Sequence, residues 1–155
     1  MSRQEPWKEL YRYWLRRHID GRPPGRGDID PLIDVPRLAG NLIIMEVLPE
    51  GVRYRLMGTV AARHFSIDLT GRYVGTGITT DAVKSAWVEA VEFVIANREA
   101  KLLVSQFPKG INHKNVVVLM PLAGQDGKTE QILAGSFTDR DYQDHMRISA
   151  MDDRA

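Results

Sequence analysis

Cysteine is absent from the 155 residues of this sequence. Its absence excludes disulfides, zinc sites built on thiolates, iron–sulfur clusters and cysteine nucleophiles. Long apolar segments are lacking as well, since no stretch approaches the roughly 18 residues of a membrane-spanning helix. The first ten residues, MSRQEPWKEL, have no apolar segment of the kind that directs secretion. The sequence therefore predicts a cytoplasmic protein with no membrane partner.

The sequence also has no excess of one charge, because 21 Lys and Arg residues are balanced by 20 Asp and Glu residues. We expect no nucleic-acid partner for a chain with a net charge of +1. The residues that are present, 43% apolar and 26% charged, have the proportions of an ordinary globular protein. The length fits one domain with one core.

A narrow apolar stripe marks the start of the chain and predicts a helix within residues 1–20. Its members recur at the spacing of one helix face: Trp7, Leu10, Tyr11, Trp14 and Leu15. So large an apolar load must cover another surface. That surface is either the domain's own sheet or a second subunit, and the five residues form the candidate dimer interface.

The remaining elements follow from apolar periodicity and turn residues. Five strands are predicted at residues 42–48, 52–58, 102–107, 115–122 and 131–137, a short helix at 60–65, a long helix from Thr79 or Thr80 to Asn97, and a helical turn at 31–34. Alternation along the second strand predicts that Val52, Tyr54 and Leu56 face one way, and Arg53, Arg55 and Met57 the other.

No arrangement of residues that performs catalysis is present. The four histidines fall on four different predicted elements, without the spacing of metal ligands. Asp28 and Asp30 resemble an acid and base pair, but aspartates in a glycine-rich and proline-rich loop are more typical of turn stabilisation. Arg55 is expected to pair with Asp30 or Asp68. We predict neither catalytic residues nor a metal site, and hence no enzyme.

Four short motifs occur in a fixed order along the chain. They are Tyr13-Trp14, Arg26-Gly27-Asp28-Ile29-Asp30-Pro31, Tyr54-Arg55-Leu56-Met57-Gly58-Thr59 and Asp68-Leu69-Thr70-Gly71-Arg72. In this order they resemble a bacterial subfamily of stand-alone PAS domains. The resemblance implies an α+β fold, with a five-stranded antiparallel sheet, helices on one face and the N-terminal amphipathic helix in addition. It divides the chain into that helix at 1–20, a PAS-like domain at 21–140 and a polar C-terminal tail at 141–155, too short for an output domain.

The resemblance also implies a function. PAS domains bind small molecules between the sheet and the long helix, or pair with other proteins. We expect a sensory module that binds an apolar or weakly polar ligand and signals through a homodimer and an unidentified signalling protein. The alternative is a ligand-free interaction module with a filled core. The cofactor is not specified, although His64 could serve as an axial haem ligand. The candidate pocket residues are Tyr54, Leu56, His64, Phe65, Tyr73, Trp87, Val91 and Phe107.

Overall fold

The computed structural model describes residues 5–75, 81–106 and 114–138. Phe107, two of the histidines, the predicted helix cap at Thr79 or Thr80 and the tail at 141–155 lie outside this part of the chain. The elements are α1 (Pro6–Arg16), η1 (Arg26–Asp28), α2 (Pro31–Asp34), η2 (Pro36–Asn41), β1 (Leu42–Leu48), β2 (Gly51–Met57), α3 (Thr59–Phe65), α4 (Asp81–Asn97), β3 (Lys101–Gln106), β4 (Lys114–Ala123) and β5 (Thr129–Thr138).

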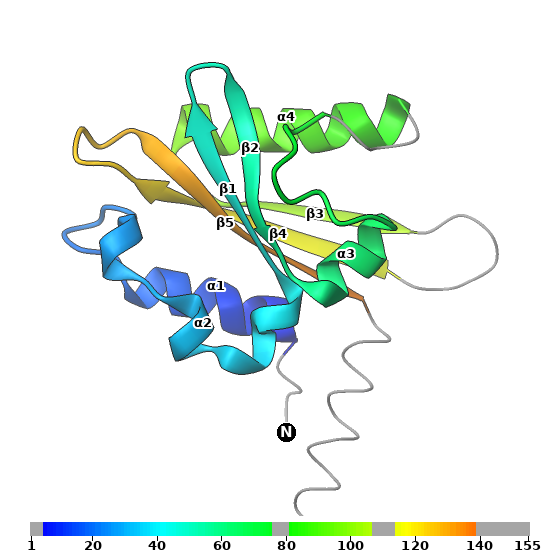
Figure 1. Ribbon diagram of the computed structural model, residues 1–155. Helices are drawn as coiled ribbons and strands as arrows, with labels where there is room; N and C mark the ends of the chain where they lie inside the picture. The colour runs from blue at the N-terminus through cyan, green and yellow to red at the C-terminus, as the bar shows by residue number, and fades with distance from the viewer. Residues whose placement is uncertain (1–4, 76–80, 107–113, 139–155) are drawn as a thin grey trace, which may run out of the picture.

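The five strands form one antiparallel sheet in the order β2-β1-β5-β4-β3, which confirms the predicted sheet. The helices α3 and α4 lie over one face, and α1 and α2 lie over the other (Figure 1). Because successive side chains of a strand point to opposite faces, the same strands supply two separate cores.

The core beneath α4 explains why this segment is helical. Trp87, Ala90, Val91 and Val94 recur at intervals of three or four residues, so that one side of the helix is apolar. All four are buried against the sheet. Their partners are buried residues of the strands and of α3: Ile43, Met45, Tyr54, Met57, Ala61, Val117, Leu119, Ile132 and Ala134.

The helix α1 packs on the sheet of its own chain. Leu10 is 0% exposed and Trp14 is 4% exposed, and the Trp14 Nε1 donates a hydrogen bond of 2.9 Å to the carbonyl of Pro121 on β4. The approach is close at Gly135 on β5, where an added Cβ would lie 2.7 Å from Leu10 Cδ2. Of the two surfaces predicted for the apolar stripe, the domain's own sheet or a second subunit, the sheet is therefore the one that α1 covers in this structure.

The predicted alternation along β2 is wrong beyond Tyr54. A β-bulge interrupts the register, so that Ile44 pairs with Leu56 while Met45 pairs with Tyr54, and Arg55 is the extra residue. An extra residue reverses the facing of every side chain after it. Leu56 therefore packs in the core under α1, whereas Met57 joins Tyr54 under α4.

The outer edge of β2 is covered by the segment at residues 71–74. Hydrogen bonds join Tyr54 N to Arg72 O at 2.9 Å, Gly71 N to Tyr54 O at 2.7 Å and Val74 N to Val52 O at 2.7 Å. The turn before this segment is held by Asp68, which accepts from the backbone N–H and the hydroxyl of Thr70 and whose pKa these bonds lower. The motif at 68–72 thus docks a loop along the sheet.

Candidate functional site

The most distinctive polar contact under α4 joins Tyr54 of β2 to Trp87 of α4. Both residues are buried, and the Trp87 Nε1 donates to the Tyr54 hydroxyl at 2.6 Å. An indole N–H only donates, so the Tyr54 oxygen is the acceptor. The Tyr54 O–H proton has no acceptor among the described residues. Burial raises the pKa of Tyr54 to about 12, against a smaller lowering by the Trp87 hydrogen bond.

Two apolar residues of the candidate pocket join this pair. The Phe65 ring meets the Trp87 ring edge to face, with centroids 5.4 Å apart. Val91 lies one turn further along α4 and is buried in the same cluster. The structure therefore brings Tyr54, Phe65, Trp87 and Val91 together, and their side chains fill the space between the sheet and α4.

A chain of polar contacts, buried at Ser136 and Asn115 and half-buried at His64, lies on the same face of the sheet, at the α3 side. His64 Nδ1 is 2.7 Å from Ser136 Oγ, and that hydroxyl donates to Asn115 Oδ1 at 3.1 Å. Because the single hydroxyl proton goes to Asn115, the Ser136 oxygen is left as an acceptor for the tautomer of His64 that carries a proton on Nδ1. Asn41 Nδ2 donates to the Ser136 carbonyl at 2.9 Å.

His64 is one of the residues predicted from the sequence, whereas Ser136 and Asn115 are not. A signal was present, because Ser136 follows Ile132 and Ala134 at intervals of two, so it occupies an inward position of an otherwise apolar strand. A polar residue in such a position requires a partner.

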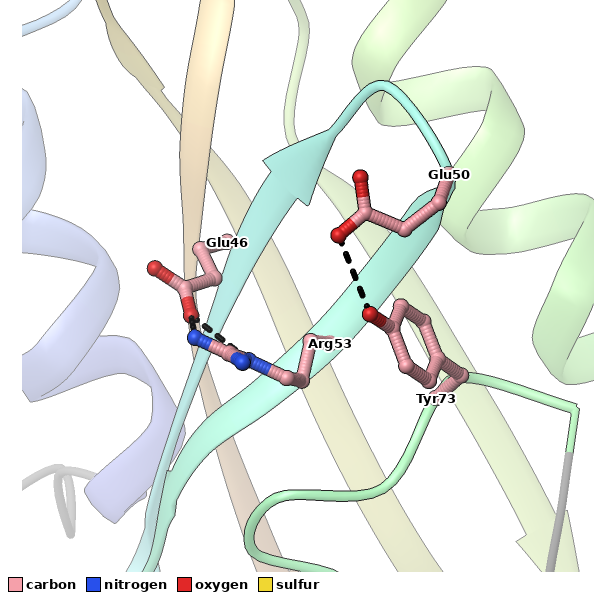
Figure 2. A network of polar contacts seen from close by, with 4 residues as sticks. All are labelled: Glu46, Glu50, Arg53 and Tyr73. Atoms are coloured by element: carbon pink, nitrogen blue, oxygen red, sulfur yellow. Dashed lines mark hydrogen bonds and ion pairs between the residues drawn. The ribbon is translucent and has the colours of Figure 1, made fainter.

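Two other residues of the candidate pocket are not part of this group. Leu56 is on the opposite face of the sheet because of the bulge. Tyr73 lies at the outer edge of β2, where its hydroxyl donates to Glu50 Oε1 at 3.1 Å (Figure 2). Beside it, Arg53 of β2 donates to Glu46 of β1 through Nε at 2.8 Å and through its terminal nitrogen (Figure 2). These contacts stabilise the β1–β2 hairpin at its polar end.

The five residues of the candidate dimer interface have different surroundings in the monomer. Leu10 and Trp14 are in the core of their own chain, Trp7 and Tyr11 are half-buried, and Leu15 is 42% exposed. An accessible apolar line therefore remains on α1 only at Trp7, Tyr11 and Leu15.

This line meets a groove beside the edge strand β3. The groove has a volume of about 430 Å³ and is lined by Trp7 of α1 together with Leu102, Val104, Val116 and Phe137 of the sheet. Val104 is 55% exposed, since α1 does not extend over β3. On the α1 side of the sheet, an apolar surface therefore stays accessible around Trp7.

A second groove, of about 390 Å³, lies between the η1–α2 segment and the sheet. Arg26, Asp30, Arg55, Leu56 and Gln131 are among the residues that line it. The prediction of an ion pair for Arg55 is wrong. Within the described residues, Arg55 forms an ion pair with neither Asp30 nor Asp68.

Of the two aspartates in the second motif, Asp28 has the turn-stabilising contact that the sequence suggested, whereas the Asp30 side chain forms no capping hydrogen bond at the start of α2. Asp28 Oδ2 accepts from the backbone N–H of Gly25 at 3.0 Å. The backbone N–H of Asp30 donates to the Tyr13 hydroxyl at 3.0 Å, and this hydroxyl donates to Asp34 at 2.5 Å. Burial and the Asp34 hydrogen bond raise the pKa of Tyr13 to about 12. The first two motifs are therefore linked through one phenol.

Within the described residues, no three His, Asp or Glu side chains gather closely enough to hold a metal ion. None of the helices in these ranges is long and apolar enough to cross a membrane.

An antiparallel sheet of five strands with a long helix across one face places the chain in the α+β class. The family model described as "PAS domain" matches residues 2–137, and the chain belongs to this family. The matched range includes α1, in agreement with its place in the fold.

Solved structures share this fold. A light-oxygen-voltage domain, studied with a flavin analogue, is 14% identical, with a TM-score of 0.51 over 83% of this chain and 99% of that chain. The PAS domain of BvgS from Bordetella pertussis is 15% identical, with a TM-score of 0.51 over 81% of this chain and 100% of that chain. No curated protein matches the sequence.

Proposed function

We propose that this chain is a sensory module that binds a small, weakly polar ligand between the sheet and α4 and transmits the bound state through protein contacts. The observation that carries the proposal is the Tyr54 hydroxyl, which is buried and has no acceptor for its proton among the described residues. A buried donor without a partner is costly. A ligand with one hydrogen-bond acceptor would satisfy it.

The surroundings of Tyr54 support a compact and largely apolar ligand. Phe65, Trp87 and Val91 offer aromatic and aliphatic surface, and Trp87 is held by its own hydrogen bond to Tyr54. Entry of a ligand requires at least one of these side chains to move. Movement of Trp87 would act directly on α4, which carries it, so ligand binding has a route to a change at the surface.

Native mass spectrometry of the purified protein, beside its denatured mass, tests the proposal. We expect extra mass that is lost on denaturation. Tyr54→Phe should lower the retained fraction about tenfold, because a hydrogen bond from a buried donor is lost. Tyr73→Phe, which removes a hydroxyl at the sheet edge, is the matched control and should retain the ligand. Equal retention by both variants would contradict a site at Tyr54.

The second candidate is a ligand-free interaction module, and the close packing around Trp87 favours it. Trp87 is 3% exposed and Val91 is 2% exposed, so the aromatic cluster behaves as core in this structure. For such a module, the native mass equals that of the chain or its oligomer. Tyr54→Phe then changes only stability, by about 1 kcal/mol.

Both candidates require a surface for protein contacts, and we propose the apolar line of Trp7, Tyr11 and Leu15 with the adjacent β3 face as a homodimer interface. Leu15→Glu tests this surface because Leu15 is exposed and its substitution leaves the core intact. In light scattering we expect the wild-type chain to be a dimer and Leu15→Glu a monomer with an unchanged circular dichroism spectrum. A variant that stays dimeric excludes this line.

A further inference from the structure

The groove between the η1–α2 segment and the sheet has the properties of a small-molecule site. Its volume of about 390 Å³ falls within the range of ligand pockets, roughly 300–1,000 Å³. Ile44, Leu56 and Leu133 provide an apolar lining from three neighbouring strands. It lies on the face of the sheet opposite to Tyr54 and Trp87, so it is a separate site from the one proposed above.

A buried amide without a partner lines this groove. Gln131 of β5 is 5% exposed, and its side chain has no hydrogen bond to any described residue. It faces the same side of the sheet as Leu133, two residues further along the strand. Buried side-chain amides in folded proteins are nearly always hydrogen-bonded. This amide is therefore available to a polar group within the groove.

The charged residues of the groove favour an anion. Arg26 of η1 and Arg55 of the β2 bulge both line it, and neither forms an ion pair within the described ranges. Asp30 is the one carboxylate among the lining residues, which leaves a net charge of +1. Glu46 is the cross-strand neighbour of Gln131, but its charge is compensated by Arg53 (Figure 2).

We propose that this groove binds an aliphatic monocarboxylate. The carboxylate accepts hydrogen bonds from the Arg26 and Arg55 guanidinium groups and from the Gln131 amide, and the alkyl chain covers Leu56 and Leu133. Arginine suits this task because its planar fork of N–H donors matches the two oxygens of a carboxylate. Asp30 opposes a second negative charge, so a carboxylate is preferred to a phosphate dianion.

Titration of the 155-residue chain with octanoate, followed by calorimetry and by backbone amide shifts, tests the proposal. We expect saturable binding with shifts at β1, β2 and β5 residues around the groove. Octanol, which has the same chain without the charge, and acetate, which has the charge without the chain, should each bind at least tenfold more weakly. Equal binding of octanol and octanoate would overturn the role of the arginines.

Substitutions assign the contacts. Arg55→Gln should weaken octanoate binding at least tenfold, while Arg12→Gln, an exposed position on α1 with the same charge change, should leave it within twofold. If Arg55→Gln does not fold, the exposed Arg26→Gln serves in its place. An unchanged affinity in a folded Arg55 or Arg26 variant would refute the proposal.

Two further variants separate this site from its alternatives. Asp30→Asn should tighten octanoate binding and allow octyl phosphate to bind as well, because the repelling charge is removed. Tyr54→Phe should leave octanoate binding unchanged, since the two sites lie on opposite faces of the sheet. Loss of octanoate binding in Tyr54→Phe would assign the ligand to the interior and exclude the groove.

Discussion

At the scale of single residues, two buried tyrosines have hydroxyl groups with a raised pKa. Tyr54 of β2 lies in the core under α4, and Tyr13 projects from α1 into the other core, with its hydroxyl between the Asp30 backbone N–H and the Asp34 carboxylate. The pKa of each is raised to about 12, in both cases mainly by burial. The folded state therefore keeps these protons at a pH where an unfolded chain loses them.

We predict that the free energy of unfolding falls as the pH rises from about 10 to about 12. Over this range the unfolded state has released the phenolic protons and the folded state has not, so ionisation stabilises the unfolded chain. Each phenol contributes up to about 1.4 kcal/mol per pH unit. Urea unfolding at pH 9, 10 and 11 measures the slope. Tyr54→Phe should reduce it, whereas a slope that is unchanged in this variant would contradict the raised pKa.

At the scale of elements, the junction between β2 and α3 packs directly against η2. A Cβ added at Gly58 would lie 2.3 Å from the Gly40 carbonyl oxygen and 2.6 Å from that of Ala39. These contacts are with backbone, which cannot rotate away as a side chain can. The glycine of the third motif is therefore required by the close approach of two chain segments.

Gly58→Ala should lower the free energy of unfolding by at least about 2 kcal/mol, the upper part of the range for overpacking a tight contact. Gly27→Ala is the matched control, since a Cβ at Gly27 would meet nothing within 4 Å. Chemical denaturation of both variants measures the difference. Equal stability of the two would mean that η2 moves away from the junction at little cost.

The positions of most helices and strands could be predicted from the sequence. The face of the sheet to which the side chains after the β2 bulge point could not. Alternation located β1 at its observed ends, and the others within about two residues, because period-two patterns are local. The bulge at Arg55 has no local signature, since its extra residue is defined only by pairing with β1. For the same reason the partners of Ser136 and the groove around Gln131 could not be predicted. Both depend on residues brought together from distant parts of the chain.

At the scale of the whole molecule, one sheet serves two cores. Ile43 and Met45 of β1 contact the layer of α4, while Leu42 and Ile44 contact the layer of α1. Neither layer can lose its packing without exposing one side of the shared strands. The two halves of the fold should therefore unfold together.

Tryptophan fluorescence can test this cooperativity, because Trp87 is in one core and Trp14 in the other. Trp87→Phe retains the two reporters on α1, and the double variant Trp7→Phe/Trp14→Phe retains Trp87 on α4 as the single reporter. For each variant we expect the urea midpoint by fluorescence to coincide with its midpoint by circular dichroism, as in a two-state transition. Midpoints that differ between the two probes would indicate that one layer separates first.

The segment at residues 71–74 has a consequence for how sheets of different molecules can join. It occupies the hydrogen-bonding positions along β2, whereas β3 ends the described sheet on the other side with its outer edge unpaired. A sheet with two open edges can add neighbours without limit, as in fibrils. Because the β2 edge is covered, two molecules can join their sheets only through β3, and after joining neither has an open edge left. Such joining stops at a pair, so the loop that covers β2 also protects the protein against polymerisation.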